Sequence, residues 1–307
     1  MKILLTGSRG MVGQNIVEYI GSSAHEFLTP SRKELNLLDY SSIEEYLKMY
    51  KPDMIVHAAG IVGGIQANMA QPVKFLVDNM QMGLNILMAS KSFEVKRFMN
   101  LGSSCMYPRN IQKSLSEDLI LKGELEPTNE GYAIAKVAST RLCEYISRED
   151  KSYLYKTVIP CNLYGKYDKF DPEHSHMIPA VIRKVNDAKK QHKDSIDIWG
   201  DGLARREFMY TGDFSNFVYY AIDHFGVMPQ NINVGIGQDY SINEYYQKIA
   251  DVVGFQGRFT HDLSRPTGMK QKLIDNTKQK DFGWHHRTPL EQGIQKTYDY
   301  FINEVNK

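Results

Sequence analysis

The sequence contains few cysteines and has no excess of charge of either sign. Its 307 residues include only Cys105, Cys143 and Cys161, and none of these form the Cys-x-x-Cys spacing of a metal site. So few cysteines argue against a disulfide framework and favour a reducing compartment. Lys and Arg number 37 against 36 Asp and Glu, so the formal net charge is +1. With no global field to attract nucleic acid or an acidic membrane, we expect neither as a partner, and we expect no metal.

Long apolar runs, internal repeats and low-complexity linkers are also missing. The first apolar run, residues 3–5, is far too short for the core of a signal peptide, and no run is long enough to span a membrane. An apolar content of 42% and a charged content of 24% are typical of a globular protein. We therefore expect a cytoplasmic protein with one large domain or two unequal ones.

Short apolar runs and amphipathic stretches alternate through the first 160 residues. This order predicts an α/β fold, a Rossmann-type doubly wound parallel sheet with helices on both faces. We expect strands at residues 2–6, 26–29, 54–60, 97–101 and 156–162, and helices at residues 14–20, 41–50, 72–93 and from about 130 to 148. The apolar residues of the third helix, expected to form its core face, are Phe75, Leu76, Met80, Leu84, Leu87 and Met88.

Beyond residue 165 the alternation loosens. Short strands are predicted at residues 196–199 and 231–234, and helices at 241–253 and 290–305. We expect residues 1–165 to form a Rossmann domain and residues 166–307 a smaller, mixed α/β C-terminal lobe that binds the substrate. Segments within about 195–235 are expected to return to the Rossmann domain. Cys143, on a predicted helix, and Cys161, in a predicted strand, are expected to be core residues.

A glycine-rich loop follows the first strand and precedes the first helix. In Gly7-x-x-Gly10-x-x-Gly13, the first glycine allows a tight turn and the second lets the backbone approach a pyrophosphate. The third lets helix and strand pack closely. The second strand leads to Arg32, where an NAD site usually has an acidic residue, and Arg9 lies in the loop. Two guanidinium groups suit a 2′-phosphate, which favours NADPH over NAD, although two solvated surface arginines remain an alternative.

Tyr132 and Lys136 are four residues apart and lie on one face of the predicted helix. An ammonium beside a phenol favours the phenolate and lowers its pKa from about 10, so that the tyrosine could exchange a proton with a substrate oxygen. The Tyr-x-x-x-Lys pattern alone is weak evidence for a catalytic pair, because a tyrosine and a lysine four residues apart are common on helix surfaces.

Several longer stretches resemble the GDP-L-fucose synthase family of extended short-chain dehydrogenases/reductases. The Ser-Ser-Cys-x-Tyr-Pro and Ser-His-x-Ile-Pro stretches are more specific than the glycine loop or Tyr-x-x-x-Lys, which the whole superfamily shares. The resemblance runs nearly end to end and includes residues 7–13, 34–39, 62–65, 101–108, 126–129, 132–136, 162–165, 175–180, 199–200, 206–208 and 233–235.

The resemblance implies a two-stage reaction on a 4-keto sugar. Cys105 resembles the family's base and His176 its acid, and together they would invert carbons 3 and 5, whose hydrogens the ketone acidifies. NADPH would then deliver hydride to carbon 4 while Tyr132, assisted by Lys136 and hydrogen-bonded near Ser103, protonates the oxygen. His176, just before a helix, would lie at its positive end, which disfavours the imidazolium. Without the resemblance, Cys105 could be a packing residue and His176 a helix cap.

The resemblance also implies two binding sets. The residues expected at the NADP cofactor are Gly7, Arg9, Gly10, Met11, Val12, Gly13, Arg32, Asp39, Ala58, Leu101, Lys136, Pro160, Leu163 and His176. Those expected at the GDP-sugar are Lys184, Trp199, Arg206 and Asp275. For these last four, a solvated side chain is nearly as good an explanation.

The expected activity is conversion of GDP-4-keto-6-deoxy-D-mannose to GDP-L-fucose by an NADPH-dependent epimerase-reductase. A related GDP-4-keto-6-deoxy-heptose or GDP-colitose-type substrate is an alternative on the same scaffold. A UDP-sugar 4-epimerase and a non-catalytic NADP-sensing protein are weaker alternatives. A homodimer is expected from the family alone.

Overall fold

A six-stranded parallel sheet forms the centre of the protein in the computed structural model, which describes residues 1–20, 23–111, 113–171, 175–264 and 269–306. The strand order is β10-β5-β4-β3-β1-β2. The strands are β1 (Lys2–Thr6), β2 (Glu26–Leu28), β3 (Met54–His57), β4 (Arg97–Leu101), β5 (Leu154–Pro160) and β10 (Asn231–Val234). Ile3, Leu4 and Leu5 are all fully buried, so β1 is covered on both faces, as a parallel sheet requires.

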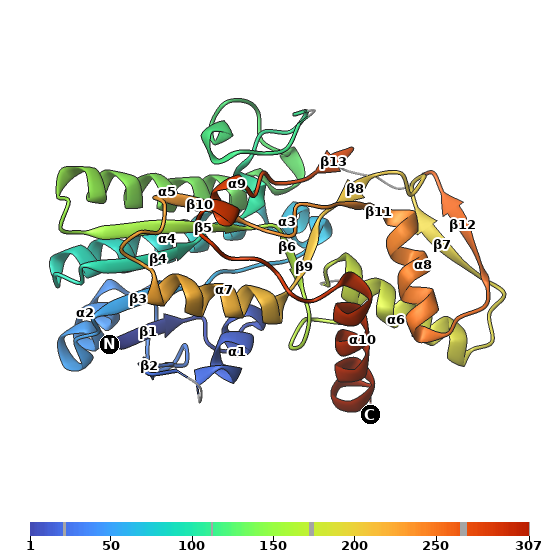
Figure 1. The fold of residues 1–307 in the computed structure, drawn as a ribbon, viewed down its shortest axis with the longest axis horizontal. Helices are drawn as coiled ribbons and strands as arrows, with labels where there is room; N and C mark the ends of the chain where they lie inside the picture. The colour runs from blue at the N-terminus through green and yellow to red at the C-terminus, as the bar shows by residue number, and fades with distance from the viewer. Residues whose placement is uncertain (21–22, 112, 172–174, 265–268, 307) are drawn as a thin grey trace.

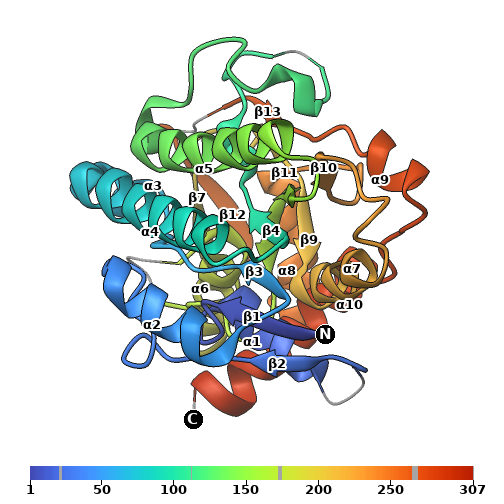
Figure 2. The ribbon, with the colours of Figure 1, turned by 90° about the vertical axis from the view of Figure 1, so that its left-hand side faces the viewer.

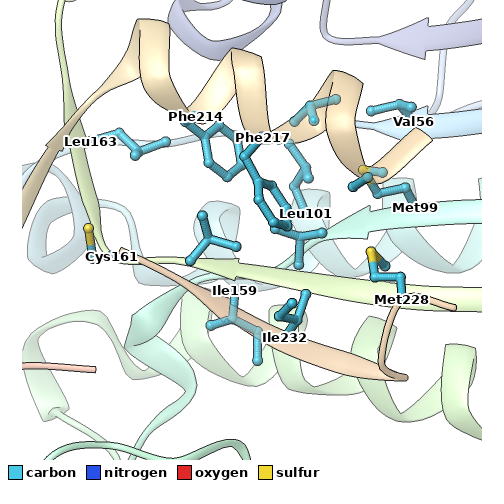
Figure 3. Close-up of a cluster of buried hydrophobic side chains, with 14 of the residues drawn as sticks. Val56, Met99, Leu101, Ile159, Cys161, Leu163, Phe214, Phe217, Met228 and Ile232 are labelled. Atoms are coloured by element: carbon cyan, nitrogen blue, oxygen red, sulfur yellow. The ribbon is translucent and has the colours of Figure 1, made fainter. Parts of the chain in front are cut away.

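Helices cover both faces of this sheet (Figures 1 and 2). The helices are α1 (Met11–Glu18) and α7 (Thr211–Asp223) on one face, and α2 (Tyr40–Tyr50), α4 (Pro72–Ser92) and α5 (Glu130–Glu149) on the other. Figure 3 shows the apolar cluster beneath α7, where Phe214 and Phe217 meet Ile159 and Ile232 of the sheet. The predicted doubly wound α/β class is therefore confirmed.

A smaller lobe has its own apolar core beside the sheet. Its main elements are α6 (Met177–Lys190), β7 (Ser195–Trp199), α8 (Ile242–Val253), β12 (Arg258–Asp262) and α10 (Leu290–Tyr300), which continues as a π-helical turn (Phe301–Val305). β7 and β12 pair in parallel. Within the described residues, no helix combines the length and apolar character needed to cross a membrane.

Short elements connect the two parts. They are α3 (Ile65–Ala70), β6 (Asn162–Tyr164), β8 (Arg205–Arg206), β9 (Phe208–Tyr210), β11 (Tyr240–Ser241), β13 (Gln271–Lys272), α9 (Thr277–Asp281), and the 3-10 turns η2 (Ser104–Met106), η3 (Glu117–Leu119) and η4 (Pro127–Asn129). β11, β8 and β13 form a three-stranded sheet, and β6 pairs with β9. β10 and α7 lie with the central sheet, whereas β7 belongs to the smaller lobe. The predicted domain boundary near residue 165 stays a prediction.

Three element predictions need correction. The expected strand 156–162 is two strands, because the chain leaves the central sheet at Cys161 and β6 pairs with β9 instead. The helix expected at residues 41–50 begins one residue earlier, at Tyr40, because Asp39 caps α2. On α4, Met88 is 42% exposed, whereas Asn79 and Asn85 are buried. Asn79 can be buried because its amide bonds both the N–H and the carbonyl of Ile61.

The cysteine predictions hold. Cys143 and Cys161 are buried core residues, and Cys105 is half-buried; all three are free thiols. Figure 3 shows Cys161 at the margin of the apolar cluster. Cys105 is therefore the cysteine with access to solvent.

Candidate active site

The glycine loop between β1 and α1 is as tight as its sequence predicts. Gly7 has φ +71°, and a Cβ there would lie 2.6 Å from the Ala59 nitrogen. A Cβ on Gly13 would lie 2.1 Å from the Gly7 carbonyl oxygen. Gly10 precedes the first turn of α1, and no described side chain caps this helix. Its first N–H groups are therefore available to donate hydrogen bonds to a phosphate.

The predicted phosphate-binding arginines are both exposed near this loop. Ser8 donates hydrogen bonds to the carbonyls of residues 29 and 30, at 3.3 and 3.2 Å, and so ties the loop to the segment after β2. Arg9 follows Ser8, and Arg32 follows that segment. Both guanidinium groups can reach solvent, as contact with a 2′-phosphate would require.

The other residues predicted at the cofactor occupy two kinds of position. Asp39 is exposed and caps α2 by accepting a hydrogen bond from the Ser41 nitrogen at 3.0 Å. The rest lie in the first turn of α1 or at the carboxyl ends of β3, β4, β5 and in β6, where doubly wound sheets bind ligands. These are Met11, Val12, Ala58, Leu101, Pro160 and Leu163. Their contacts with a cofactor stay predictions.

Lys136 is a nearly buried cation at the end of β4. Its side chain, 8% exposed, donates a hydrogen bond to the Leu101 carbonyl at 2.9 Å. Burial lowers the pKa of Lys136 to about 8. The neighbouring His57 is buried too, with Nδ1 2.8 Å from Thr6 Oγ1. Burial, and then the charge of Lys136, lower the pKa of His57 to about 3, so this imidazole is neutral.

Tyr132 lies on the same face of α5 as Lys136, with the ammonium 5.8 Å from the centre of its ring. Burial is the main influence on Tyr132 and raises the pKa of its phenol; the charge of Cys105 does the same, while a hydrogen bond with Ser103 opposes them. The expectation that Lys136 lowers the pKa of this phenol is therefore wrong for the free protein, because burial dominates. A protonated phenol is suited to donate a proton.

Cys105 lies in η2, beside Tyr132. Ser103 caps η2, its Oγ accepting a hydrogen bond from the Cys105 nitrogen at 3.2 Å. The Cys105 sulfur accepts two further hydrogen bonds, from Asn129 Nδ2 at 3.2 Å and from Lys272 Nζ at 3.5 Å. A sulfur with two donors aimed at it is well placed to carry negative charge.

Sequence reasoning did not assign Asn129 or Lys272 to the site. Asn129 lies in residues 126–129 and Lys272 in residues 272–275, a further stretch that resembles the family, and this resemblance was the one available signal. They are 24 and 167 residues away from Cys105 in the chain, so no spacing could reveal their contact with its sulfur.

His176 precedes the first residue of α6. Burial lowers the pKa of His176, and the charges of Lys169 and Lys272 lower it further. The direction agrees with the expectation from the helix dipole, although the main cause is burial. Lys272 thus interacts with both Cys105 and His176, and links the predicted base to the predicted acid.

The predicted substrate residues are less closely gathered. Lys184 pairs with Asp197, its Nζ 2.9 Å from the carboxylate. Trp199 ends β7 and is 45% exposed. Arg206 is the register partner of Lys272 in the β8–β13 pair, so it lies on the strand beside the lysine that contacts Cys105. Asp275 accepts hydrogen bonds from the Thr277 nitrogen and hydroxyl, so its carboxylate closes the turn before α9.

The structure therefore places Ser103, Cys105, Tyr132 and Lys136 in one cluster at the carboxyl end of β4. Lys272 contacts Cys105, and its charge also lowers the pKa of His176. A nicotinamide-binding fold with a Ser-Tyr-Lys group defines an enzyme of the short-chain dehydrogenase/reductase type.

Comparisons with known proteins place the chain more closely. Residues 3–235 match the NAD dependent epimerase/dehydratase family. The chain is 60% identical to a GDP-L-colitose synthase of Yersinia pseudotuberculosis, with 100% of this chain and 99% of the relative covered. It is 47% identical to a GDP-L-fucose synthase of Azorhizobium caulinodans, with coverage of 99% and 98%. A GDP-mannoheptose C4 reductase of Campylobacter jejuni, solved with NADP bound, superposes with a TM-score of 0.88 at 27% identity, covering 98% of each chain.

The chain belongs to the NAD-dependent epimerase/dehydratase family, in the group that holds GDP-L-fucose and GDP-L-colitose synthases. The family recognised in the sequence is thereby confirmed.

Proposed function

We propose that the protein is an NADPH-dependent epimerase-reductase of a GDP-linked 4-keto-6-deoxy-hexose. The observation that carries this proposal is the Cys105 sulfur, which accepts hydrogen bonds from Asn129 and Lys272 beside Tyr132. A reductase needs the tyrosine and the lysine, but it has no use for a stabilised thiol. A base beside the ketone is what inversion of a neighbouring carbon requires.

The enzyme class and the cofactor follow from the comparisons. The family is nicotinamide-dependent, and related structures hold NADP, so the predictions of a nucleotide-sugar enzyme and of NADPH are confirmed. The glycine loop and the N-terminus of α1 would hold the pyrophosphate, with Arg9 and Arg32 at the 2′-phosphate. NADPH supplies hydride, and the chain's own residues supply the protons.

In the proposed reaction, Cys105 first removes a proton from the carbon beside the ketone. The electron pair moves to the ketone oxygen, which forms an enolate. Ser103 stabilises that oxygen by a hydrogen bond. His176 returns a proton on the opposite face of the sugar. After hydride reaches carbon 4, Tyr132 donates its proton to the oxygen, and Lys136 stabilises the resulting phenolate.

The product we propose is GDP-L-colitose, with GDP-L-fucose as the second candidate. Sequence analysis favoured fucose, but the identity is 60% to a colitose synthase against 47% to a fucose synthase, at nearly complete coverage of both. Colitose lacks the 3-hydroxyl of fucose, so carbon 3 is no stereocentre and inversion is needed at carbon 5 alone. The same base and acid suffice for either sugar.

The test compares both ketones, GDP-4-keto-3,6-dideoxy-mannose and GDP-4-keto-6-deoxy-mannose, by NADPH oxidation in deuterated water and mass analysis. We expect the dideoxy sugar to have the higher kcat/KM and to gain deuterium at carbon 5. Cys105→Ser should suppress deuterium incorporation but spare reduction of a ketone with the inverted configuration. Tyr132→Phe should lower reduction by about 100-fold or more and leave exchange intact. Reduction without deuterium would leave a plain 4-reductase and would contradict the proposal.

We also propose that two copies of the chain pair through α4 and α5. These helices pack side by side, and each presents exposed apolar residues: Val73, Val77 and Met88 on α4, and Ile134 and Tyr145 on α5. Their spacing puts each set on one stripe of its helix. Two adjacent apolar stripes suit a second copy, because isologous pairing would form a four-helix contact.

A further inference from the structure

We propose that Lys272 is a positioning residue for Cys105, whose ammonium holds the sulfur and favours the thiolate that removes the substrate proton. This inference rests on the proposed function, because it gives Cys105 the role of the base. It goes beyond that function by assigning a role to a residue of β13, an element far from the Ser-Tyr-Lys group in the chain.

The contact itself is the first argument. Lys272 Nζ donates to the Cys105 sulfur at 3.5 Å, and Asn129 Nδ2 donates to it at 3.2 Å. The asparagine amide is neutral, so of the two donors only Lys272 brings a full charge to the sulfur. A nearby ammonium stabilises a thiolate far more than it stabilises a thiol.

The backbone around Lys272 is held on both sides, which fixes where its side chain begins. Residues 271–272 pair with β8, and the Leu273 carbonyl accepts a hydrogen bond from the Leu115 nitrogen at 2.9 Å. The Ile274 nitrogen donates to Glu207 Oε2 at 3.0 Å, and Glu207 is fully buried. A lysine anchored so firmly at its backbone loses less freedom when its ammonium binds the sulfur.

The same ammonium acts on the predicted acid. Burial lowers the pKa of His176 first, and the charges of Lys169 and Lys272 lower it further. An imidazolium destabilised in this way gives up its proton more readily. Lys272 therefore favours the charge state of the base and the proton release of the acid at once.

The proton balance of the step is complete. The Cys105 thiolate takes the proton from the carbon, which leaves the electron pair on the ketone oxygen as an enolate. The His176 imidazolium gives a proton to that carbon from the other face, and the enolate returns to the ketone. Cys105 and His176 then exchange protons with water to restore the starting state. The charged or titratable groups that interact with Cys105 in the described structure are Lys272 and Tyr132.

The experiment measures alkylation of Cys105 by iodoacetamide, in which the thiolate attacks carbon and iodide leaves. Because Cys143 and Cys161 are buried, the reagent reports on Cys105, and peptide mass analysis verifies the position. Lys272→Met should slow alkylation of Cys105 at pH 7 about tenfold and displace the pH profile of the alkylation rate to higher pH, because the ammonium that favours the thiolate is gone. Lys272→Arg should recover most of the rate. Lys280→Met, at an exposed lysine of α9, is the matched control and should behave as wild type.

The second measurement is deuterium incorporation into the proposed ketone. Lys272→Met should lower it at least tenfold and spare reduction of the inverted ketone. Alkylation needs no sugar, so it tests the role of Lys272 even if the proposed substrate is wrong. If the wild-type enzyme incorporates no deuterium, the proposed function is overturned, whereas the alkylation result on Lys272 still stands. If Lys272→Met is alkylated at the wild-type rate with an unchanged pH profile, the role of Lys272 is refuted. A variant that merely loosened the site would be alkylated faster, which would also refute it.

Discussion

Lys136 carries a charge in a place where charge is poorly solvated. Its ammonium donates a hydrogen bond to the Leu101 carbonyl at 2.9 Å, and burial lowers the pKa of Lys136 to about 8, from an ordinary value of 10.5. Such a group destabilises the fold whenever it is protonated. In the proposed mechanism, this loss of stability is the cost of holding a cation beside Tyr132.

Lys136→Met should accordingly stabilise the protein while abolishing reduction. Because the folded pKa lies below the unfolded one, the penalty is complete below about pH 8 and fades as pH rises towards 10.5. We expect the free energy of unfolding at pH 7 to rise by about 1–3 kcal/mol, and the advantage to shrink by pH 10. Urea unfolding without cofactor at both pH values measures this. A variant less stable than wild type at pH 7 would contradict the account.

Around Cys105, single residues were only partly predictable. Cys105 and Tyr132 were both predicted from their stretches, and the structure places them together, but the pKa of Tyr132 was expected to fall and instead rises. Spacing along a helix shows which side chains are neighbours, yet it cannot show how much water the folded chain leaves around them. Burial depends on every element that packs over the helix.

At the scale of elements, the glycine loop is where sequence and structure agree best. Gly7 and Gly13 are required by close backbone contacts, whereas a Cβ on Gly10 would meet only the Gly7 oxygen, at 3.4 Å. Gly7 and Gly13 are therefore required by the close packing of the backbone. Gly10 is not, and the role we propose for it is contact with the cofactor.

This difference predicts that one substitution lowers the stability of the protein and another lowers its affinity for NADPH. Gly13→Ala should destabilise the protein by about 1–3 kcal/mol, because its Cβ would lie 2.1 Å from a backbone oxygen. Gly10→Ala should leave the melting temperature nearly unchanged but weaken NADPH binding at least tenfold, because a methyl group would stand between backbone and pyrophosphate. Thermal unfolding and fluorescence titration separate the two effects. Equal loss of stability in both variants would argue against this division of roles.

Helix α4 shows that a helical pattern of apolar residues does not fully determine which side chains are buried. Its helical period was evident, and Phe75 and Leu87 are buried as expected, but Met88 is exposed and the buried Asn79 and Asn85 were not predicted. The buried amides bond backbone groups of Ile61 and Leu37, in loops that only the fold brings near. Apolar residues left outside this core are Val73, Val77 and Met88 on α4, and Ile134 and Tyr145 on the adjacent helix α5.

At the scale of the whole molecule, these exposed apolar residues of α4 and α5 should control assembly. Replacing Val73 and Val77, which are 72% and 51% exposed, by lysine should convert a dimer to monomers, because like charges would face each other across the contact. Sedimentation velocity measures the result. Met49→Lys, at a 73% exposed residue of α2, is the control and should leave the dimer intact. A wild-type protein that sediments as a monomer would refute the pairing.

The sequence by itself determined what depends on neighbours along the chain. The alternation of strands and helices, the tight Gly7–Gly13 loop and the shared face of Tyr132 and Lys136 follow from backbone geometry and from spacings of three or four residues. Only the tertiary structure decided that Lys272 meets a sulfur 167 residues away, that burial governs the phenol of Tyr132, and which face of α4 is core. Those results depend on β13 pairing with β8 and on loops packing over helices, and contacts of that range leave no periodic trace in a sequence.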